Sequence, residues 1–211
     1  MASMRVKLHS DPSRDISRQN DVLLVLGDGD SMPTDLDRFL SWGVFHDASA
    51  VGRGIKVYPG YVRHWFCGDG DTSIWWAKNL PNGNDTVRHC MGECDGFDVD
   101  WDLEQEDYHY CTITGESNVG RMHGSSAMFA TLAGLALGYK KIVLAGCPMD
   151  MNGHFYWPEK KKETLGPVWL GVDFMAWIDF ARQEDARRVR SMSGYTAKIL
   201  GEATEGWIHG E

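Results

Sequence analysis

The chain has 211 residues, 43% of them hydrophobic and 24% charged, and its formal net charge is -9. This composition is ordinary for a folded globular domain and argues against intrinsic disorder. A nucleic acid is not expected as a partner, because the sequence has no basic stretch long enough to neutralise a series of phosphates. A membrane span is not expected either, because no apolar run reaches the roughly 18 residues that a bilayer requires.

The five cysteines are an odd number in a chain of this length, so they do not indicate a disulfide framework. A reducing compartment suits them better. The amino-terminal residues lack the apolar core of a secretory signal peptide. Together these features predict a cytoplasmic protein.

Residues 1–20 are polar and irregular, and we expect them to form a flexible lead-in to a single domain over residues 21–211. Residues 22–26 are an unbroken run of Val and Leu, which is typical of a strand buried on both faces of a parallel sheet. The remaining strands are expected, in chain order, at residues 44–47, 62–67, 86–90, 108–114, 142–145 and 189–193. Helices are expected at residues 35–42, 125–137 and 169–182.

Strands and helices alternate through much of the chain, which predicts an α/β fold with one Rossmann-like, three-layer domain around a mostly parallel sheet. In such sheets, ligands bind beyond the carboxyl ends of the strands, where the strand order reverses. Functional residues are therefore expected at the strand ends. Periodicity does not decide whether the apolar helix near the carboxyl terminus packs on the sheet or on a second copy of the chain, so a homo-oligomer stays open.

A Gly-Asp-Gly-Asp sequence follows two of the expected strands, at residues 27–30 and 68–71. Glycine lets a backbone approach a ligand closely, and carboxylate oxygens are ligands that Mg²⁺ and Mn²⁺ prefer. Either loop alone is explained equally well as a turn. Their repetition at strand ends favours a divalent-metal site built from Asp28, Asp69 and Asp71. The first loop is not a dinucleotide fingerprint, because the third glycine of G-x-G-x-x-G is missing.

Two further strand-end segments carry polar side chains. Ser125 and Ser126 open the helix expected at residues 125–137, where a serine either caps the helix or offers its hydroxyl to a phosphate. The strand expected at residues 142–145 is followed by a loop that contains Asp150, His154 and Tyr156. His154 is a candidate base or metal ligand, although a single histidine in a loop more often has neither role.

The residues just described resemble those of one superfamily. Its members carry a first-strand loop of the form G-N-G-P-S-L, and residues 26–32 read L-G-D-G-D-S-M here. They also carry a serine-opened helix, then L-G-Y-K, a strand and G-x-D, to which Ser126, residues 137–140, residues 142–146 and Asp150 correspond. The chain is thus similar, over roughly residues 22–160, to the group that joins bacterial lipo-oligosaccharide sialyltransferases, flagellar motility-accessory-factor glycosyltransferases and archaeal 6-hydroxymethylpterin diphosphokinase.

The resemblance to the sialyltransferase branch implies donor-binding roles. The loop asparagine that helps to hold the donor in that branch matches Asp28, and its helix-opening serine matches Ser126. A tyrosine that contacts the donor phosphate matches Tyr156 when residues 152–153 align with the branch's Asn-Gly. The catalytic histidine of the branch lies further along the chain, but no histidine occurs here between residues 155 and 208, which argues against sialyl transfer itself.

The resemblance to the diphosphokinase branch implies a different chemistry. That branch uses carboxylates and Mg²⁺ around a nucleoside triphosphate, which suits Asp28, Asp30, Asp69 and Asp71. The metal neutralises the charge that develops on a transferred phosphoryl group or on a leaving diphosphate. The leaving group of a nucleotide sugar has the same requirement.

Three functions follow as hypotheses. The first is a glycosyltransferase-like transferase that holds a nucleotide-activated donor at the strand ends, with a divalent metal, Mg²⁺ or Mn²⁺, and with His154 or Asp150 as the base. Its expected donor-binding residues are Gly27, Asp28, Gly29, Ser31, Asp47, Ser125, Ser126 and Tyr156. The second is a Mg²⁺-dependent nucleotide diphosphokinase or phosphotransferase on the same fold. The third is a non-catalytic binding or assembly protein, which the missing histidine and the altered first loop favour.

Overall fold

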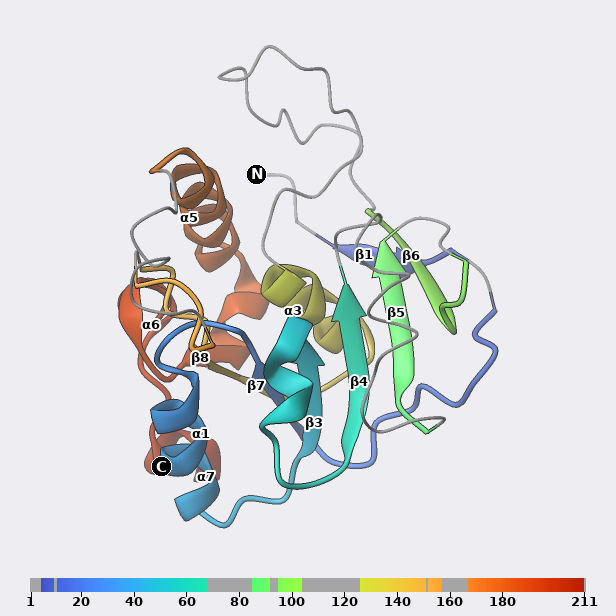
Figure 1. The fold of residues 1–211 in the computed structure, drawn as a ribbon, viewed down its shortest axis with the longest axis horizontal. Helices are drawn as coiled ribbons and strands as arrows, with labels where there is room; N and C mark the ends of the chain where they lie inside the picture. Colours follow the sequence, from blue (N-terminus) through green and yellow to red (C-terminus); the bar gives the residue numbers. More distant parts are fainter. Residues whose placement is uncertain are drawn as a thin grey trace.

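The structure is a computed structural model that describes residues 5–9, 11–67, 85–91, 95–103, 126–150, 152–156 and 167–210. These residues form an α/β fold in which helices lie against an eight-stranded, mostly parallel sheet (Figure 1). The strands are β1 Val6–Leu8, β2 Val22–Leu26, β3 Asp47–Val51, β4 Val62–Cys67, β5 Val87–Met91, β6 Val99–Leu103, β7 Lys141–Ala145 and β8 Val189–Ser191. The α/β class and the mostly parallel sheet expected from the sequence are therefore confirmed.

The strand order is β1-β6-β5-β4-β3-β2-β7-β8, and only β1 runs antiparallel to its neighbour. The chain leaves β2 for β3 and β4 on one side, and it later returns to β7 and β8 on the other side of β2. The strand order thus reverses between β2 and β7. The carboxyl ends of these two strands mark the position where open α/β sheets commonly bind ligands.

Each face of the sheet carries its own core. The described helices are α1 Met32–Ser41, α3 Ser126–Ala136, α5 Pro167–Ala181, α6 Gly194–Leu200 and α7 Glu205–His209, with 3-10 helices η1 Gly52–Lys56 and η2 Glu184–Arg188. Leu23 and Val25 of β2 pack in the core that contains residues of α3 and α5, whereas Leu24 and Leu26 pack in the core that contains residues of α1. This alternation is why the β2 sequence is apolar throughout.

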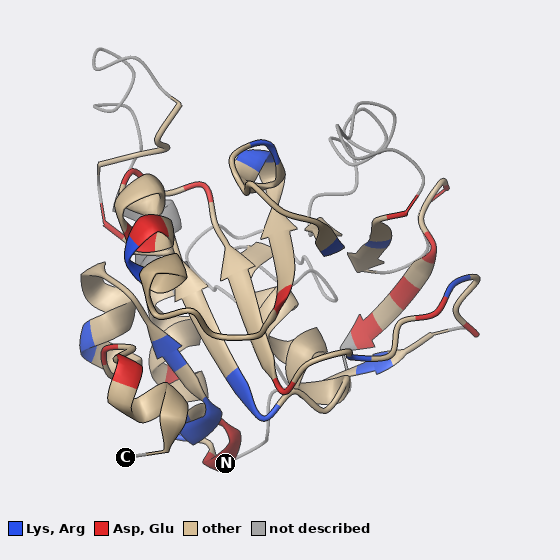
Figure 2. Ribbon diagram, turned by 90° about the horizontal axis from the view of Figure 1, so that it is seen from below, with Lys and Arg blue, Asp and Glu red and all other residues tan. Residues whose placement is uncertain are grey.

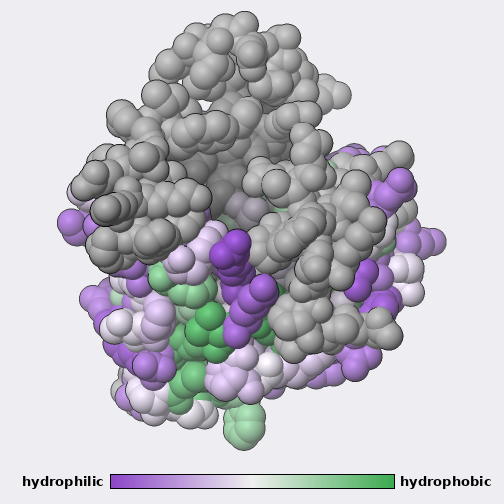
Figure 3. Space-filling view, viewed as in Figure 1, coloured by the Kyte–Doolittle hydropathy of each residue, from purple (hydrophilic) through white to green (hydrophobic). Residues whose placement is uncertain are grey.

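Hydrophobic residues reach the surface on the side of the sheet that carries α1 and η1 (Figure 3), where Leu40, Val44 and Val57 are only partly buried. On β6, Asp100 and Asp102 alternate with the buried Val99 and Trp101, and the acidic positions form bands along that strand in Figure 2. Among the described residues, no helix combines the length and apolar character needed to cross a bilayer.

The strand β3 lies at other residues than the sequence predicts. We expected it at residues 44–47, but β3 occupies Asp47–Val51. Phe45 is 89% exposed in the connection before it. The strand itself is D-A-S-A-V and is buried throughout, so its small residues gave no hydrophobic strand pattern. This shift moves Asp47 from the expected carboxyl end to the amino end of the strand.

Part of the segment expected as a lead-in is the strand β1. Val6–Leu8 pairs with Leu103, Asp102 and Trp101 of β6, and Val6 is buried in the core beneath α3. Arg63 of β4 donates from its Nε and Nη2 atoms to the carbonyl oxygen of Ser17 at 3.0 and 2.7 Å. Both residue 6 and residue 17 are therefore joined to the sheet. The strand expected at residues 108–114 lies outside the described residues.

A chain of buried polar side chains crosses the sheet from β6 to β3. Trp101 Nε1 donates to His89 Nδ1 at 3.1 Å, so the neutral His89 ring carries its proton on Nε2. His89 Nε2 lies 2.9 Å from His64 Nδ1, and His64 Nε2 lies 3.2 Å from the hydroxyl oxygen of Tyr139. Tyr139 in turn donates to Asp47 Oδ2 at 2.7 Å. Each neutral group thus donates to the next.

Candidate functional site

The loops that follow β2 and β7 are in direct backbone contact. The N–H of Gly27 donates to the carbonyl oxygen of Ala145 at 2.8 Å, and the N–H of Gly29 donates to that of Gly146 at 2.7 Å. A Cβ atom on Gly27 would lie 2.5 Å from Cys147 Sγ, and one on Gly29 would lie 2.7 Å from the Gly146 carbonyl oxygen. The two glycines are required because the loops leave no space for side chains between them.

The carboxylate of Asp28 anchors a third loop. Its Oδ2 accepts the main-chain N–H of Arg53 at 3.0 Å, and its Oδ1 accepts that of Gly54 at 2.8 Å, both at the start of η1. Burial raises the pKa of the Asp28 carboxyl above its ordinary value, although these two amides and the nearby charges of His154 and Arg53 act in the opposite direction. The carboxylate expected to bind a donor or a metal therefore already binds backbone amides.

The expected metal site is only partly within the described residues. Asp69 and Asp71 lie outside them. Among the residues that the structure places, no three His, Cys, Asp or Glu side chains are grouped so that they could hold a metal ion. A metal bound to Asp28 would compete with the Arg53 and Gly54 amides. The divalent metal therefore stays a prediction, and its best candidate ligands are Asp69 and Asp71.

The segment after β7 folds back against the first loop. The N–H of Asp30 donates to the Gly153 carbonyl oxygen at 3.0 Å, and the N–H of Phe155 donates to the Asp28 carbonyl oxygen at 3.0 Å. His154 Nδ1 lies 3.2 Å from the same Asp28 oxygen. A donating Nδ1–H leaves the lone pair of a neutral ring on Nε2, the atom that a general base would use.

Three side chains are stacked where these loops meet. The rings of His154 and Tyr156 are parallel, with an interplanar angle of 2° and centroids 5.2 Å apart. The guanidinium carbon of Arg53 lies 4.1 Å from the Tyr156 ring centroid. Loops after β2, β3 and β7 thus contribute to one cluster at the carboxyl edge of the sheet. The sequence predicted His154 and Tyr156 there but did not predict Arg53.

Asp35 is a second residue near the site that the sequence did not predict. Its side chain is 4% exposed, and its Oδ2 accepts hydrogen bonds from the Ser31 hydroxyl at 2.9 Å, the Ser193 hydroxyl at 2.6 Å and the Gly146 N–H at 3.0 Å. It joins α1 to the loops after β7 and β8. Helical spacing could have indicated that Asp35 is buried, because Asp35 shares the buried face of α1 with Met32, Leu36 and Phe39. Ser31 therefore lies at the edge of the site but is bound to Asp35.

Asp150 and Ser126 are two further predicted residues that the structure describes. Both carboxylate oxygens of Asp150 accept from Asn152, one from its N–H and one from its side-chain amide, each at 3.0 Å. Ser126 is the first residue of α3, which contacts β2, β3 and β4 and ends shortly before the amino end of β7, so the helix begins toward the carboxyl edge. Ser125 lies outside the described residues.

Asp47 does not belong to this edge of the sheet, because it begins β3 at the opposite end. Its side chain accepts from the main-chain N–H groups of Gln19 and Asn20, at 2.7 and 3.2 Å, and from the Tyr139 hydroxyl. Burial opposes ionisation of Asp47, but these hydrogen bonds outweigh it and lower the pKa of the carboxyl. The structure thus places Asp47 at the opposite edge from the other predicted donor-binding residues, and its carboxylate joins the start of β3 to residues 19, 20 and 139.

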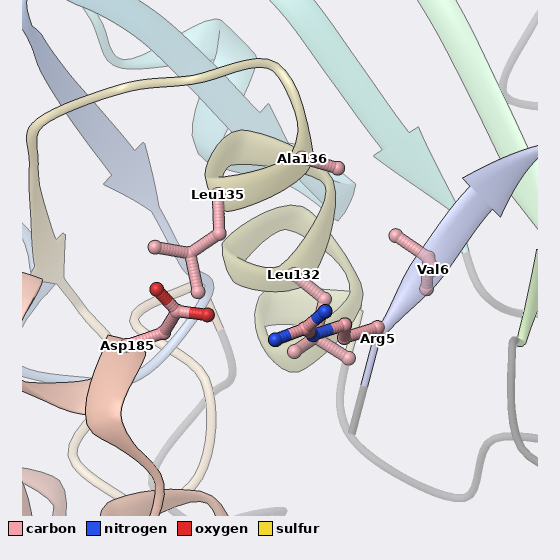
Figure 4. Close-up of a pocket in the computed structure, with 6 residues that line it drawn as sticks. All are labelled: Arg5, Val6, Leu132, Leu135, Ala136 and Asp185. Carbon is pink, nitrogen blue, oxygen red and sulfur yellow. The ribbon is translucent and has the colours of Figure 1, made fainter. Parts of the chain in front are cut away.

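A pocket of about 310 Å³ lies away from the site (Figure 4). Its walls are Val6 with Arg5, the carboxyl-terminal half of α3 at Leu132, Leu135 and Ala136, and Asp185 of η2. None of its described lining residues belongs to the loops after β2, β3 and β7. The pocket is therefore separate from the cluster at the carboxyl edge.

Replacement of Asp28 by asparagine should destabilise the protein, although asparagine is the residue that the resemblance would place there. An asparagine has one side-chain oxygen, so it can satisfy only one of the Arg53 and Gly54 amides well, and its NH₂ group would face the other. We expect a loss of about 1–3 kcal/mol in the free energy of unfolding. Urea denaturation of Asp28→Asn beside Asp37→Asn, on the same loop-helix unit, measures it. Equal stability of the two variants would contradict the anchoring role.

Comparison of the chain with protein-family models, with curated proteins and with solved structures gives no match.

Proposed function

We propose that the protein is a glycosyltransferase-like transferase that binds a nucleotide-activated donor at the carboxyl ends of β2, β3 and β7. The observation that carries this proposal is the convergence of three loops, with Arg53, His154 and Tyr156, where the strand order reverses. The order β4-β3-β2-β7-β8 supports a Rossmann-like domain, because it has the 3-2-1-4-5 pattern of such sheets, with β5, β6 and β1 added at one side.

The chemistry of the cluster suits transfer from a phosphate ester. A cation stabilises a leaving phosphate, and a base takes the proton of the acceptor hydroxyl. His154 is the better candidate for this base, because the hydrogen bond from its Nδ1 to the Asp28 carbonyl oxygen places the lone pair on Nε2. Asp150 is less suitable, because both of its oxygens accept hydrogen bonds from Asn152. If a divalent metal takes part, Asp69 and Asp71 would hold it.

A reducing, cytoplasmic location belongs to the same proposal. Within the described part of the chain, Cys67, Cys90 and Cys147 are all buried, and Cys147 is a free thiol. A chain that keeps its cysteines reduced needs no oxidising compartment to fold.

A thermal-shift panel tests the proposal. Nucleoside mono-, di- and triphosphates and several nucleotide sugars would each be added with and without Mn²⁺ or Mg²⁺. A ligand at 100 times its Kd adds about 2.7 kcal/mol to the free energy of unfolding, so the unfolding midpoint should rise clearly with at least one nucleotide sugar. A shift with ATP or GTP and Mg²⁺ alone would favour the phosphotransferase instead. No shift with any compound would overturn the proposal and favour the binding or assembly protein.

A further inference from the structure

Arg53 is held through both its main chain and its side chain. Its N–H donates to Asp28 Oδ2 at 3.0 Å, which fixes the start of η1. Its guanidinium carbon lies 4.1 Å from the centroid of the Tyr156 ring. Stacking on a ring uses the face of a guanidinium, while its N–H groups lie in the plane and donate along the edge. Contact with the Tyr156 ring therefore restricts where the guanidinium and its donors can lie.

Tyr156 is fixed in its turn by the first loop. Its ring stacks on that of His154 and meets the Phe155 ring edge to face, with centroids 5.2 Å apart in both pairs. The segment is held by the Asp28 carbonyl oxygen, which accepts the Phe155 N–H at 3.0 Å. Asp28 thus supports Arg53 twice, because its carboxylate binds the Arg53 main chain and its carbonyl binds the segment that carries the Tyr156 platform.

The charge of Arg53 has a clear use at this edge of the sheet. The chain has a formal net charge of -9, so its average field repels an anionic ligand. A planar guanidinium with a fixed edge binds phosphate oxygens in a bidentate manner, which a lysine cannot do. The neighbouring Asp28 carboxylate accepts two backbone amides, which offset part of its negative charge.

We propose that Arg53 binds the phosphate of the nucleotide ligand and that Tyr156 and Asp28 are positioning residues for its guanidinium. This inference rests on the proposed function and names the group that recognises its substrate class, a nucleoside phosphate. It also gives Tyr156 a different task from the one that the resemblance implies. The aromatic ring supports Arg53, and the hydroxyl is not needed for contact with the phosphate.

Isothermal titration with CMP, UDP, GDP and ADP, and with the four corresponding uncharged nucleosides, tests the role of Arg53. The titrations are run with EDTA and with Mg²⁺. Arg53→Gln should weaken binding of the nucleotides about 10- to 100-fold and leave nucleoside binding unchanged. Arg182→Gln is the matched control, because Arg182 forms an exposed ion pair with Asp179, and it should bind as the wild type does. Unfolding midpoints check that both variants fold.

Substitutions of Tyr156 separate its ring from its hydroxyl. Tyr156→Phe should keep the nucleotide affinity of the wild type, whereas Tyr156→Ala should weaken nucleotide binding several-fold and leave nucleoside binding unchanged. Wild-type nucleotide binding by Arg53→Gln would overturn the inference while leaving the proposed function intact. A loss of binding in Tyr156→Phe equal to that in Tyr156→Ala would overturn the positioning role. Failure of the wild type to bind any of the nucleotides would overturn both the inference and the proposed function.

Discussion

The free energy of unfolding should fall by about 1.4 kcal/mol per pH unit for each of His64 and His89 as the pH drops below about 6.5. Burial lowers the pKa of His64 to about 3, and the charge of Arg63 acts in the same direction. Burial also lowers the pKa of His89 well below its ordinary value, with a further contribution from His64. The two rings are fully buried and lie on adjacent strands, β4 and β5.

The direction of the effect follows from proton binding. Below about pH 6.5 the unfolded chain protonates both imidazoles, while the folded protein keeps them neutral until much lower pH. Unfolding then takes up protons, so acid favours the unfolded state, and for His64 the loss continues down to about pH 3. A protonated His64 would also present an N–H to the N–H of His89, which breaks the hydrogen bond between the rings.

Urea denaturation between pH 7 and pH 4.5 measures this dependence. His64→Gln should reduce the slope of stability against pH by about 1.4 kcal/mol per unit, whatever its stability at pH 7. His209→Gln changes an exposed histidine of α7 and should keep the wild-type slope. An unchanged slope in His64→Gln would contradict the prediction. It would show that the His64 ring is already protonated in the folded protein, or that the region around it unfolds locally before global unfolding.

Replacement of Gly27 by alanine should cost about 3 kcal/mol of stability, which is the upper range for overpacking a closed region. The added Cβ would lie 2.5 Å from Cys147 Sγ and 2.9 Å from the Gly146 carbonyl carbon. Backbone atoms cannot move aside as a flexible side chain can. The loops after β2 and β7 must therefore separate, and the hydrogen bond from the Gly27 N–H to the Ala145 carbonyl oxygen must lengthen.

Gly43→Ala is the matched control for this substitution. Gly43 has a φ of +64°, but a Cβ atom there would meet nothing within 4 Å. Its cost of about 1 kcal/mol reflects only the left-handed backbone. Chemical denaturation compares the two variants directly. If Gly27→Ala were no less stable than Gly43→Ala, the close approach of the two loops would be excluded.

The sequence predicts the strands best where a run of large apolar residues or a flanking glycine marks them. β2 and β4 begin and end at the predicted residues, because Val22–Leu26 is apolar throughout and Val62–Cys67 is bounded by glycine. The helix expected at residues 35–42 begins earlier, at Met32, since Pro33 suits the first turn of a helix. β3 and β1 could not be recognised, because one is made of small residues and the other is a short edge strand with only Val6 buried.

The candidate site, too, is predicted only in part from the sequence. The strand-end rule brings the loops at Asp28 and His154 together, since β2 and β7 are neighbours, and the structure places them in contact. The sequence did not predict that Asp28 binds the amides of Arg53 and Gly54. Because β3 was predicted at the wrong residues, the position of η1 after the carboxyl end of that strand was not predicted either. Asp47 was assigned to the wrong edge for the same reason. Single errors in strand ends thus change the predicted chemistry of a site.

The position of β2 between β3 and β7 has a consequence for how the protein folds. Its partner β7 lies more than a hundred residues later in the chain, with Val22 paired to Lys141, while β3 follows β2 directly. Pairing of sequence-distant strands is entropically costly and slows folding. During synthesis the β2–β3–β4 half can assemble first, but the loops around Asp28 and His154 can meet only after β7 has been made. The candidate site should therefore be among the last regions to acquire its native structure.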